Sequence, residues 1–218
     1  MTTETLERIL SVLEDLYPET ECFLHHEKDY ELLFAVILSA QATDVSVNKV
    51  TKTLFWHYPD LESFAKAKAE DIQKEIKSIG LSKTKSEYLV KTARILLEEY
   101  KGEVPKDREK LMALPGVGFK TSGVVLAELY DYPFLPVDTH VKRVTSRLGI
   151  VSEKLTPEQT EIALEKKIHQ DHIIQVHRRF ILFGRNVCLA RNPQCGICPL
   201  RDCCYEYRKK FGKNNKMD

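Results

Sequence analysis

Apolar residues recur at every third or fourth position along most of the chain. Five of them fall on one face near the N-terminus and predict an amphipathic helix that ends at Pro18: Leu6, Ile9, Leu10, Leu13 and Leu16. Residues 31–40 are apolar almost all round, which predicts a helix buried on every side. Alternation with a period of two is scarce over any strand-length run, so the sequence predicts an all-α fold.

The same spacing continues through the middle of the chain. Asp44 or Ser46 is expected to cap a helix there. Further helices are predicted from residue 61 and across residues 72–79, 84–99 and 107–114. A bundle of short helices joined by tight turns follows from this pattern.

A weak internal repeat lies within these helices. Ile76-x-x-Ile79 followed by GLSKTK resembles Leu111-x-x-Leu114 followed by PGVGFKT. Each copy would be a helix, a tight turn and a second helix. Two such hairpins can equally arise by chance in a helical bundle.

The composition limits the size and location of the protein. The chain has 218 residues, 43% of them apolar and 30% charged, which is ordinary for one globular domain or two small ones. No run reaches the roughly 18 apolar residues that a membrane-spanning helix requires. The first residues lack the basic and apolar segments of a secretion signal. We therefore expect a cytoplasmic protein with no membrane partner, associated with the nucleoid if the cell is bacterial.

The charge is unevenly distributed, although its net value is only +1. Residues 178–218 contain ten Lys or Arg and three Asp or Glu, so this segment carries +7 and the first 177 residues carry −6. A basic C-terminal segment indicates a surface for a polyanion such as nucleic acid. On charge alone, a solvated basic tail is an equal alternative.

Residues 108–130 have the features of a helical hairpin with a phosphate-binding turn. Pro115 would end the first helix, and Gly116 and Gly118 permit positive φ and close approach of the backbone. Val117 would point inward between the helices. The second helix would then present free N–H groups to a phosphate. The alternative is an ordinary turn between two helices, but the apolar flanks favour a phosphate-binding helix-hairpin-helix motif.

Lys120 would lie in the first turn of that second helix. The helix dipole disfavours a cation there by typically ~0.3–1 kcal/mol, and a neutral amine is the form that makes a Schiff base. A lysine that simply contacts a phosphate explains the position more economically. Asp138 precedes another predicted helix and is expected to cap it, although a carboxylate fixed there can also face a cleft.

Five of the six cysteines lie within one short segment. Four of them follow the pattern Cys188-x6-Cys195-x2-Cys198-x5-Cys204. In an intracellular protein, such a cluster indicates metal binding rather than disulfides. Zinc sites usually pair two short knuckles across a longer spacer, so zinc is the less favoured metal for this compact loop.

Four motifs occur in order along the chain: LSAQATD at residues 38–44, LPGVG-x-KT at residues 114–121, VDTHV-x-R at residues 137–143 and the cysteine loop at residues 188–204. Together they resemble the endonuclease III branch of the helix-hairpin-helix DNA glycosylases, from about residue 30 to residue 204. The cysteine spacing resembles the [4Fe–4S] loop of this branch, which selects Cys204 rather than its neighbour Cys203. Arg185, Arg191 and Arg201 are expected around the cluster.

The resemblance implies a bifunctional enzyme of base excision repair, a DNA glycosylase and AP lyase that removes oxidised pyrimidines from duplex DNA. Lys120 would displace the damaged base, form a Schiff base at C1′ and drive β-elimination 3′ to the abasic site. Asp138 would be its carboxylate partner. Because the target atom is inaccessible inside a duplex, the damaged nucleotide must be extruded.

The resemblance also implies a set of DNA contacts. Gln41 and Leu81 would fill the vacated space in the base stack. The other expected contacts are the turn residues and three basic side chains: Gly116, Val117, Gly118, His140, Arg143 and Arg191. Phe119 departs from the family, since many relatives carry a basic or polar residue there, and this puts one local backbone contact in doubt.

The family implies two helical domains with a DNA cleft between them. Residues 22–132 would form the domain with the hairpin, and residues 1–21 plus 133–218 would form the cluster-bearing domain. The expected partner of the monomer is double-stranded DNA with damaged pyrimidines or abasic sites. Two other functions stay open: a non-catalytic DNA-binding iron–sulfur module, and a monofunctional glycosylase in which Lys120 only contacts phosphate.

Overall fold

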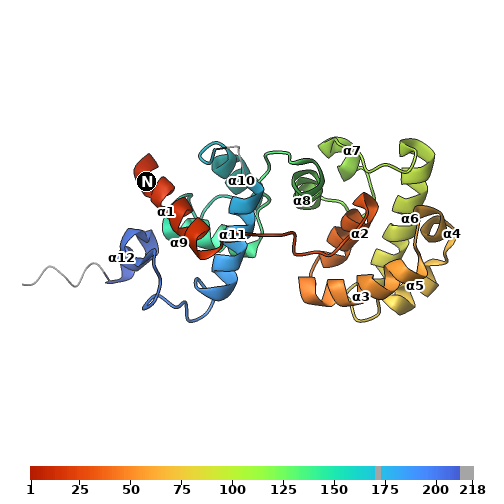
Figure 1. Ribbon diagram of the computed structural model, residues 1–218, viewed down its shortest axis with the longest axis horizontal. Coiled ribbons are helices and arrows are strands. Elements are labelled where there is room, and N and C mark those ends of the chain that lie inside the picture. The colour runs from red at the N-terminus through yellow and green to blue at the C-terminus, as the bar shows by residue number, and fades with distance from the viewer. Residues whose placement is uncertain (170–172, 212–218) are drawn as a thin grey trace, which may run out of the picture. The chain divides into compact units, whose positions relative to one another are not determined.

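The computed structural model describes residues 1–169 and 173–211 (Figure 1). Regular structure in these ranges consists of twelve α-helices and one short 3-10 helix, and they contain no strand. The predicted all-α fold is confirmed. No helix in the described ranges has the length and the apolar content needed to span a bilayer.

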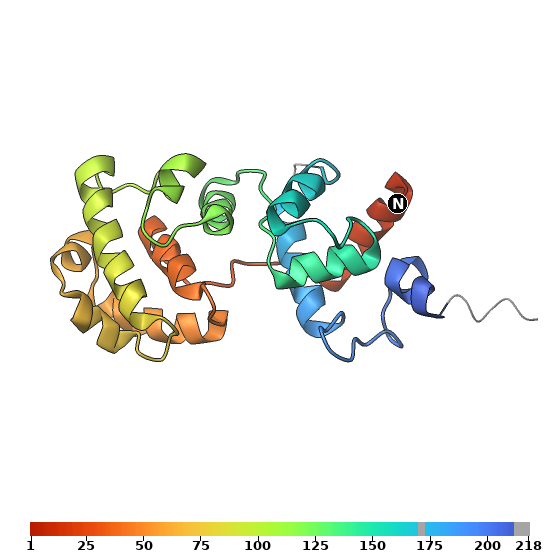
Figure 2. The same ribbon diagram turned by 180° about the vertical axis from the view of Figure 1, so that it is seen from behind.

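The helices belong to two compact units, and the chain contributes two separate stretches to one of them (Figure 2). The hairpin unit is Cys22–Tyr132, and the cysteine unit is Met1–Glu21 with Pro133–Asp218. The hairpin unit contains α2 (Asp29–Ser39), α3 (Asp44–His57), α4 (Leu61–Lys66), α5 (Ala69–Glu75), α6 (Ser82–Tyr100), α7 (Arg108–Met112) and α8 (Phe119–Tyr130). The cysteine unit contains α1 (Thr3–Leu16), α9 (Thr139–Leu148), α10 (Pro157–Glu165), α11 (Ile173–Asn186), the 3-10 helix η1 (Arg201–Cys203) and α12 (Tyr205–Phe211).

Helix α2 is the central helix of the hairpin unit. Every residue from Tyr30 to Leu38 is buried, as the apolar run over residues 31–40 predicts, and the helix packs against α3, α6 and α8. The ring of Phe34 lies edge-to-face on Phe64 of α4, with the ring centroids 4.9 Å apart. Leu38 is the last of these buried residues, and the helix ends one residue later at Ser39.

The cap of α3 differs from the sequence prediction. Thr43, rather than Asp44 or Ser46, is the N-cap, and its Oγ1 accepts a hydrogen bond from the backbone N–H of Ser46 at 3.2 Å. Asp44 lies in the first turn, where its negative charge is favourable to the helix dipole. All three residue types cap helices well, so composition alone could not choose among them.

The two helical hairpins of the hairpin unit share a backbone feature at their turns. Helices α5 and α6 pack together, as do α7 and α8. Leu81 in the first turn and Gly116 in the second both have left-handed φ values, 61° and 80°. These residues occupy equivalent positions of the internal repeat, so the similarity extends from sequence to backbone conformation.

Helix α11 forms the core of the cysteine unit and packs against α1 and α9. The buried side chain of Arg179 on α11 reaches the end of α1. Its Nε donates to the carbonyl oxygen of Tyr17 at 3.1 Å, and its Nη2 donates to that of Pro18 at 3.2 Å and to Glu14 Oε1 at 2.8 Å. These contacts join the first helix of the chain to a late one.

Replacement of Gly116 by alanine should destabilise the hairpin unit. An added Cβ would lie 2.5 Å from Tyr88 Cδ2 and 3.2 Å from Ile37 Cγ2, and the φ of 80° is strained for alanine. We expect the free energy of unfolding to fall by about 1–3 kcal/mol, measured by urea denaturation. Gly118→Ala is the control, because Gly118 has a φ of −100° and no atom lies within 4 Å of an added Cβ. Equal losses in both variants would contradict the steric explanation.

Candidate functional site

The hairpin turn presents its backbone at the surface of the hairpin unit. Val117 is 6% exposed, so its side chain packs inward as expected, whereas Gly116 and Gly118 are exposed. Gly118 is the N-cap of α8 and no side chain caps this helix end. The first N–H groups of α8 therefore suit an anionic group of a ligand.

Lys120 is the second residue of α8, and its side chain is exposed. Within the described ranges, the side chain of Lys120 makes no hydrogen bond or ion pair. An exposed amine on a helix start is accessible to a large substrate.

Phe119, the departure from the family pattern, lies under a cation. The guanidinium of Arg108 on α7 stacks over the Phe119 ring, with Cζ 4.1 Å from the ring centroid. A cation–π contact of this kind holds the arginine against the aromatic face. A positive charge is thus present beside this turn even though residue 119 is apolar.

Asp138 is the N-cap of α9, as its position before a helix predicts. Its Oδ1 accepts a hydrogen bond from the backbone N–H of Val141 at 2.7 Å. The side chain is half-buried. This capping bond fixes the carboxyl group in one orientation at the start of α9.

Arg143 and His140 brace α9 against the end of α11. Arg143 Nη2 donates to the carbonyl oxygen of Gly184 at 2.8 Å and lies 3.1 Å from His140 Nδ1, while its Nε donates to the carbonyl oxygen of Cys188 at 3.0 Å. Burial lowers the pKa of His140, which favours the neutral ring that accepts this bond. The DNA contacts expected of these two residues stay predictions.

Gln41 and Leu81 both lie in turns of the hairpin unit with strained backbone. Their φ values are 58° and 61°, in the left-handed region that residues other than glycine rarely adopt. Both side chains are exposed, Leu81 to 58%. The structure therefore presents two side chains outward from two strained turns.

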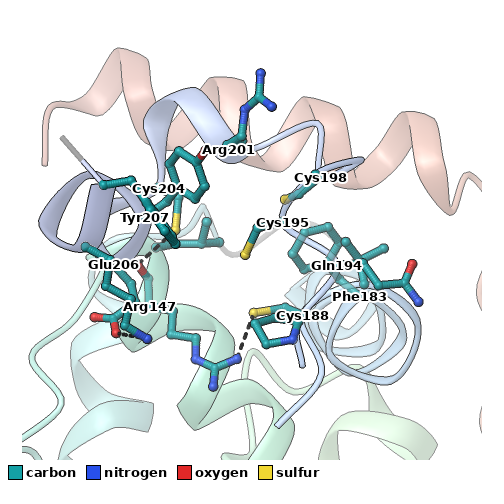
Figure 3. A pocket seen from close by; sticks show the side chains of 16 residues that line it. Arg147, Phe183, Cys188, Gln194, Cys195, Cys198, Arg201, Cys204, Glu206 and Tyr207 are labelled. Carbon is teal, nitrogen blue, oxygen red and sulfur yellow. Dashed lines mark hydrogen bonds and ion pairs between the residues drawn. The ribbon is translucent and has the colours of Figure 1, made fainter. Parts of the chain in front are cut away.

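The four predicted cysteines line one cavity of about 460 Å³ in the cysteine unit. Figure 3 shows the sulfur atoms of Cys188, Cys195, Cys198 and Cys204 around a common space. In the described part of the chain, no three His, Cys, Asp or Glu side chains form a group that could hold a metal ion. The thiols surround a space instead of converging on a single point.

Cys203 differs from its neighbour Cys204. It is buried, its Sγ donates to the carbonyl oxygen of Leu200 at 3.3 Å, and it does not line the cavity. The adjacent thiols thus have different environments. Of these two thiols, that of Cys204 lines the cavity together with the other three cysteines.

The electrostatics of the cavity disfavour bare thiolates. Burial raises the pKa of Cys198 to about 11, and it also raises the pKa of Cys204. Neighbouring cysteines raise both values further, because thiolates close together repel one another. A positively charged metal core would reverse this balance, since coordination deprotonates a thiol.

Arg147 of α9 is a residue of this cavity that the sequence did not reveal. Its Nη1 lies 3.6 Å from Cys188 Sγ (Figure 3). The same Nη1 donates to the carbonyl oxygen of Leu189 at 2.7 Å, and Nη2 donates to the carbonyl oxygen of Ala190 at 3.1 Å. The one available signal was its spacing of four residues from Arg143 on the same helix face.

The arginines expected around the cysteines are placed differently from one another. Arg201 lines the cavity, whereas Arg185 and Arg191 are exposed and lie outside its lining. Arg147 and Lys210 complete the cationic lining. Glu206 also lines the cavity and pairs with Lys210 at 2.9 Å. The lining thus keeps an excess of positive charge around four thiols, which suits a metal–thiolate group with a net negative charge.

The family comparison defines the class of protein. Residues 34–170 match a family model described as "HhH-GPD superfamily base excision DNA repair protein". This range contains the hairpin turn, Lys120 and Asp138, and it ends before the cysteine loop.

Curated relatives and solved structures extend the similarity to nearly the whole chain. Endonuclease III of Bacillus subtilis (strain 168) is 43% identical over 208 residues, 95% of each chain. Endonuclease III of Escherichia coli (strain K12) is 44% identical over 202 residues, 93% of this chain and 95% of the relative. A structure of a trapped endonuclease III–DNA covalent intermediate has a TM-score of 0.91 at 40% identity, covering 96% of this chain and 99% of that chain. The chain belongs to the HhH-GPD superfamily of base excision DNA repair proteins and, within it, to the endonuclease III family.

Arg147→Met should loosen the start of the cysteine loop. The variant removes the donors to the carbonyl groups of Leu189 and Ala190, which costs about 1–3 kcal/mol when these acceptors lose their partner. We expect faster hydrogen exchange in residues 188–191 and a lower free energy of unfolding. Arg191→Met is the matched control, because its side chain is exposed. Equal exchange rates in the two variants would show that Arg147 does not hold the loop.

Proposed function

We propose that the chain is a bifunctional DNA glycosylase and AP lyase of base excision repair. The observation that carries this proposal is the similarity, over nearly the full length, to endonuclease III trapped in a covalent complex with DNA. A covalent enzyme–DNA intermediate is what a Schiff-base lyase forms. Oxidised pyrimidines in duplex DNA are the proposed substrates, with abasic sites as substrates of the lyase step.

Lys120 is the proposed nucleophile. Its amine attacks C1′ of the damaged nucleotide, and the glycosidic bond breaks as the base leaves with the bonding electrons and takes up a proton. The sugar ring then opens to give an iminium ion between C1′ and the lysine nitrogen. Loss of a proton from C2′ expels the 3′ phosphate, which cleaves the strand 3′ to the abasic site. The exposed position of Lys120 at the start of α8 supports this role.

Asp138 is the proposed carboxylate partner in this reaction. One oxygen of its carboxyl group is engaged by the backbone N–H of Val141. The other oxygen would steady the developing positive charge on the sugar or relay a proton during base release. A carboxyl group already held by a capping bond loses little conformational entropy when it contacts the sugar.

The DNA backbone is proposed to bind at the hairpin turn. The N–H groups of Gly116, Gly118 and the first turn of α8 would face a phosphate, and Val117, whose N–H donates to Leu114, would hold the turn from within. The nearby guanidinium of Arg108 would add a positive charge. Gln41 and Leu81 would occupy the space left by the extruded nucleotide. Their outward side chains on strained turns support this assignment.

The remaining proposed DNA contacts differ in their surroundings. Arg191 is exposed and available to a phosphate. Arg143 and His140 are engaged with each other and with α11, so they would support DNA binding by holding the start of α9 in place. None of these contacts reads the base sequence.

A [4Fe–4S] cluster is the proposed occupant of the cysteine cavity. Four thiols around a space, with Arg147, Arg201 and Lys210 beside them, fit a polynuclear iron–thiolate group better than a single zinc ion. When bound, the cluster would supply four iron–thiolate bonds that fix an irregular loop. The steps of glycosidic cleavage require no electron transfer, so its proposed role is structural.

Lys120→Ala should abolish covalent trapping. Wild-type protein treated with borohydride on duplex DNA that contains thymine glycol or an abasic site is expected to form a stable adduct, and the variant to lose it by about 100-fold or more. Lys91→Ala is the control, because Lys91 is an exposed lysine of the same unit. An adduct that persists in Lys120→Ala would reject this nucleophile. Base release by the wild type without strand cleavage would instead indicate a monofunctional glycosylase. If the wild type catalyses neither base release nor strand cleavage, the protein is a non-catalytic module.

Cys204→Ser and Cys203→Ser form a matched pair that tests the cluster ligands. Cys204→Ser should lower the iron content and the visible absorbance, because it removes one thiolate from the cavity. Cys203→Ser should keep both, since Cys203 is outside the lining and serine can still donate to Leu200. Iron and sulfide analysis of purified protein measures the difference. The same loss in both variants would contradict the assignment of Cys204.

A further inference from the structure

Lys85 is a buried lysine on α6 that the proposed chemistry does not use. It is 3% exposed, and its Nζ donates to the carbonyl oxygens of Leu38 at 2.8 Å and Ala40 at 2.6 Å. Burial lowers the pKa of Lys85, and within the described residues no carboxylate pairs with it. The cost of burying this ammonium group is offset only by the groups that it bonds.

The two acceptors of Lys85 lie at the C-terminal end of α2. Helix α2 ends at Ser39, with Ala40 as its C-cap, so these carbonyl groups carry the negative end of the helix dipole. Charge-assisted hydrogen bonds to such carbonyls offset part of the cost of burying the ammonium group. The contact therefore anchors α6 to the end of α2.

Both strained turns lie directly next to this contact. Gln41 follows Ala40, and Leu81 lies four residues before Lys85. The backbone N–H of Lys85 donates to the carbonyl oxygen of Leu81 at 2.9 Å, while its side chain holds Ala40. One residue thus bonds the turn of Leu81 through its backbone and the turn of Gln41 through its side chain.

We propose that Lys85 is a positioning residue that joins the turns of Gln41 and Leu81, so that their side chains enter the DNA duplex as one rigid pair. This inference rests on the proposed function, which assigns both side chains to the space left by the extruded nucleotide. The left-handed φ of each residue is unfavourable by itself, and strained turns persist when surrounding contacts determine them. Lys85 supplies such a contact to both turns.

The first experiment measures whether Lys85 joins the two turns, without any DNA. Lys85→Met keeps most of the side-chain volume and removes the charge and the donors. Hydrogen exchange should become at least about tenfold faster in segments 38–43 and 79–86, while the rest of α6 is unchanged. Lys91→Met, an exposed lysine of the same helix, is the control. Unchanged exchange in both segments would overturn the proposal.

The second experiment separates positioning from general loss of stability. Extrusion of a paired, damaged base depends on the side chains of Gln41 and Leu81, which would fill the space that it leaves. A pre-formed abasic site depends on them less, because it has no base to remove from the stack. Under single-turnover conditions, Lys85→Met should release a paired thymine glycol about tenfold more slowly and cleave an abasic site within about twofold of the wild-type rate. Equal losses on both substrates would indicate partial unfolding and overturn the proposal.

A double-mutant cycle with Gln41→Ala completes the test, because the side chain of Lys85 holds the turn of Gln41. The combined variant should lose clearly less activity in base release than the sum of the two single losses, and fully additive losses would overturn the proposal. If the wild type neither releases bases nor forms an adduct, the proposed function fails and the DNA role of Lys85 fails with it. The exchange experiment would still decide whether Lys85 joins the two turns.

Discussion

Backbone carbonyl groups left unpaired at helix ends are satisfied in this protein by long cationic side chains from other helices. Arg179 bonds the carbonyls after α1, Lys85 those at the end of α2, Arg94 that of Ala65 in α4, and Arg143 that of Gly184 in α11. Each cation also meets the negative end of a helix dipole, so hydrogen bonding and electrostatics act together. Short helices with many ends need many such contacts.

The loops that carry the candidate chemistry begin at these same ends. The turn of Gln41 follows the end of α2, which Lys85 holds, and the cysteine loop follows the end of α11, which Arg143 holds. Arg147 extends this support to the next two carbonyl groups of the loop. These contacts hold the start of the cysteine loop beside the cavity that the four thiols line. The structural cations set the position of the loop, and the thiols are its candidate metal ligands.

The sequence predicted what depends on local spacing and missed what depends on distant carbonyl groups. The burial of α2 and the cap at Asp138 could be predicted because apolar periodicity and capping are short-range. Arg147 could not, because its acceptor at Leu189 is 42 positions away and a backbone carbonyl leaves no mark in the sequence. The role of Lys85 could not be predicted for the same reason. Lys120 was expected in the first turn of its helix, and it lies there with an exposed side chain.

The cysteine unit has a consequence for the order of events during synthesis. Helix α1 is translated first, but its ion-pair partner Arg179 lies 165 positions beyond Glu14. The hairpin unit comes from one continuous stretch, so all its helices are synthesised before α11, against which α1 packs. The thiols follow later still, after α11. A nascent chain can therefore pack its first helix against α11 only shortly before its four cavity cysteines are translated. A product truncated before α11 would lack both the packed first helix and these cysteines.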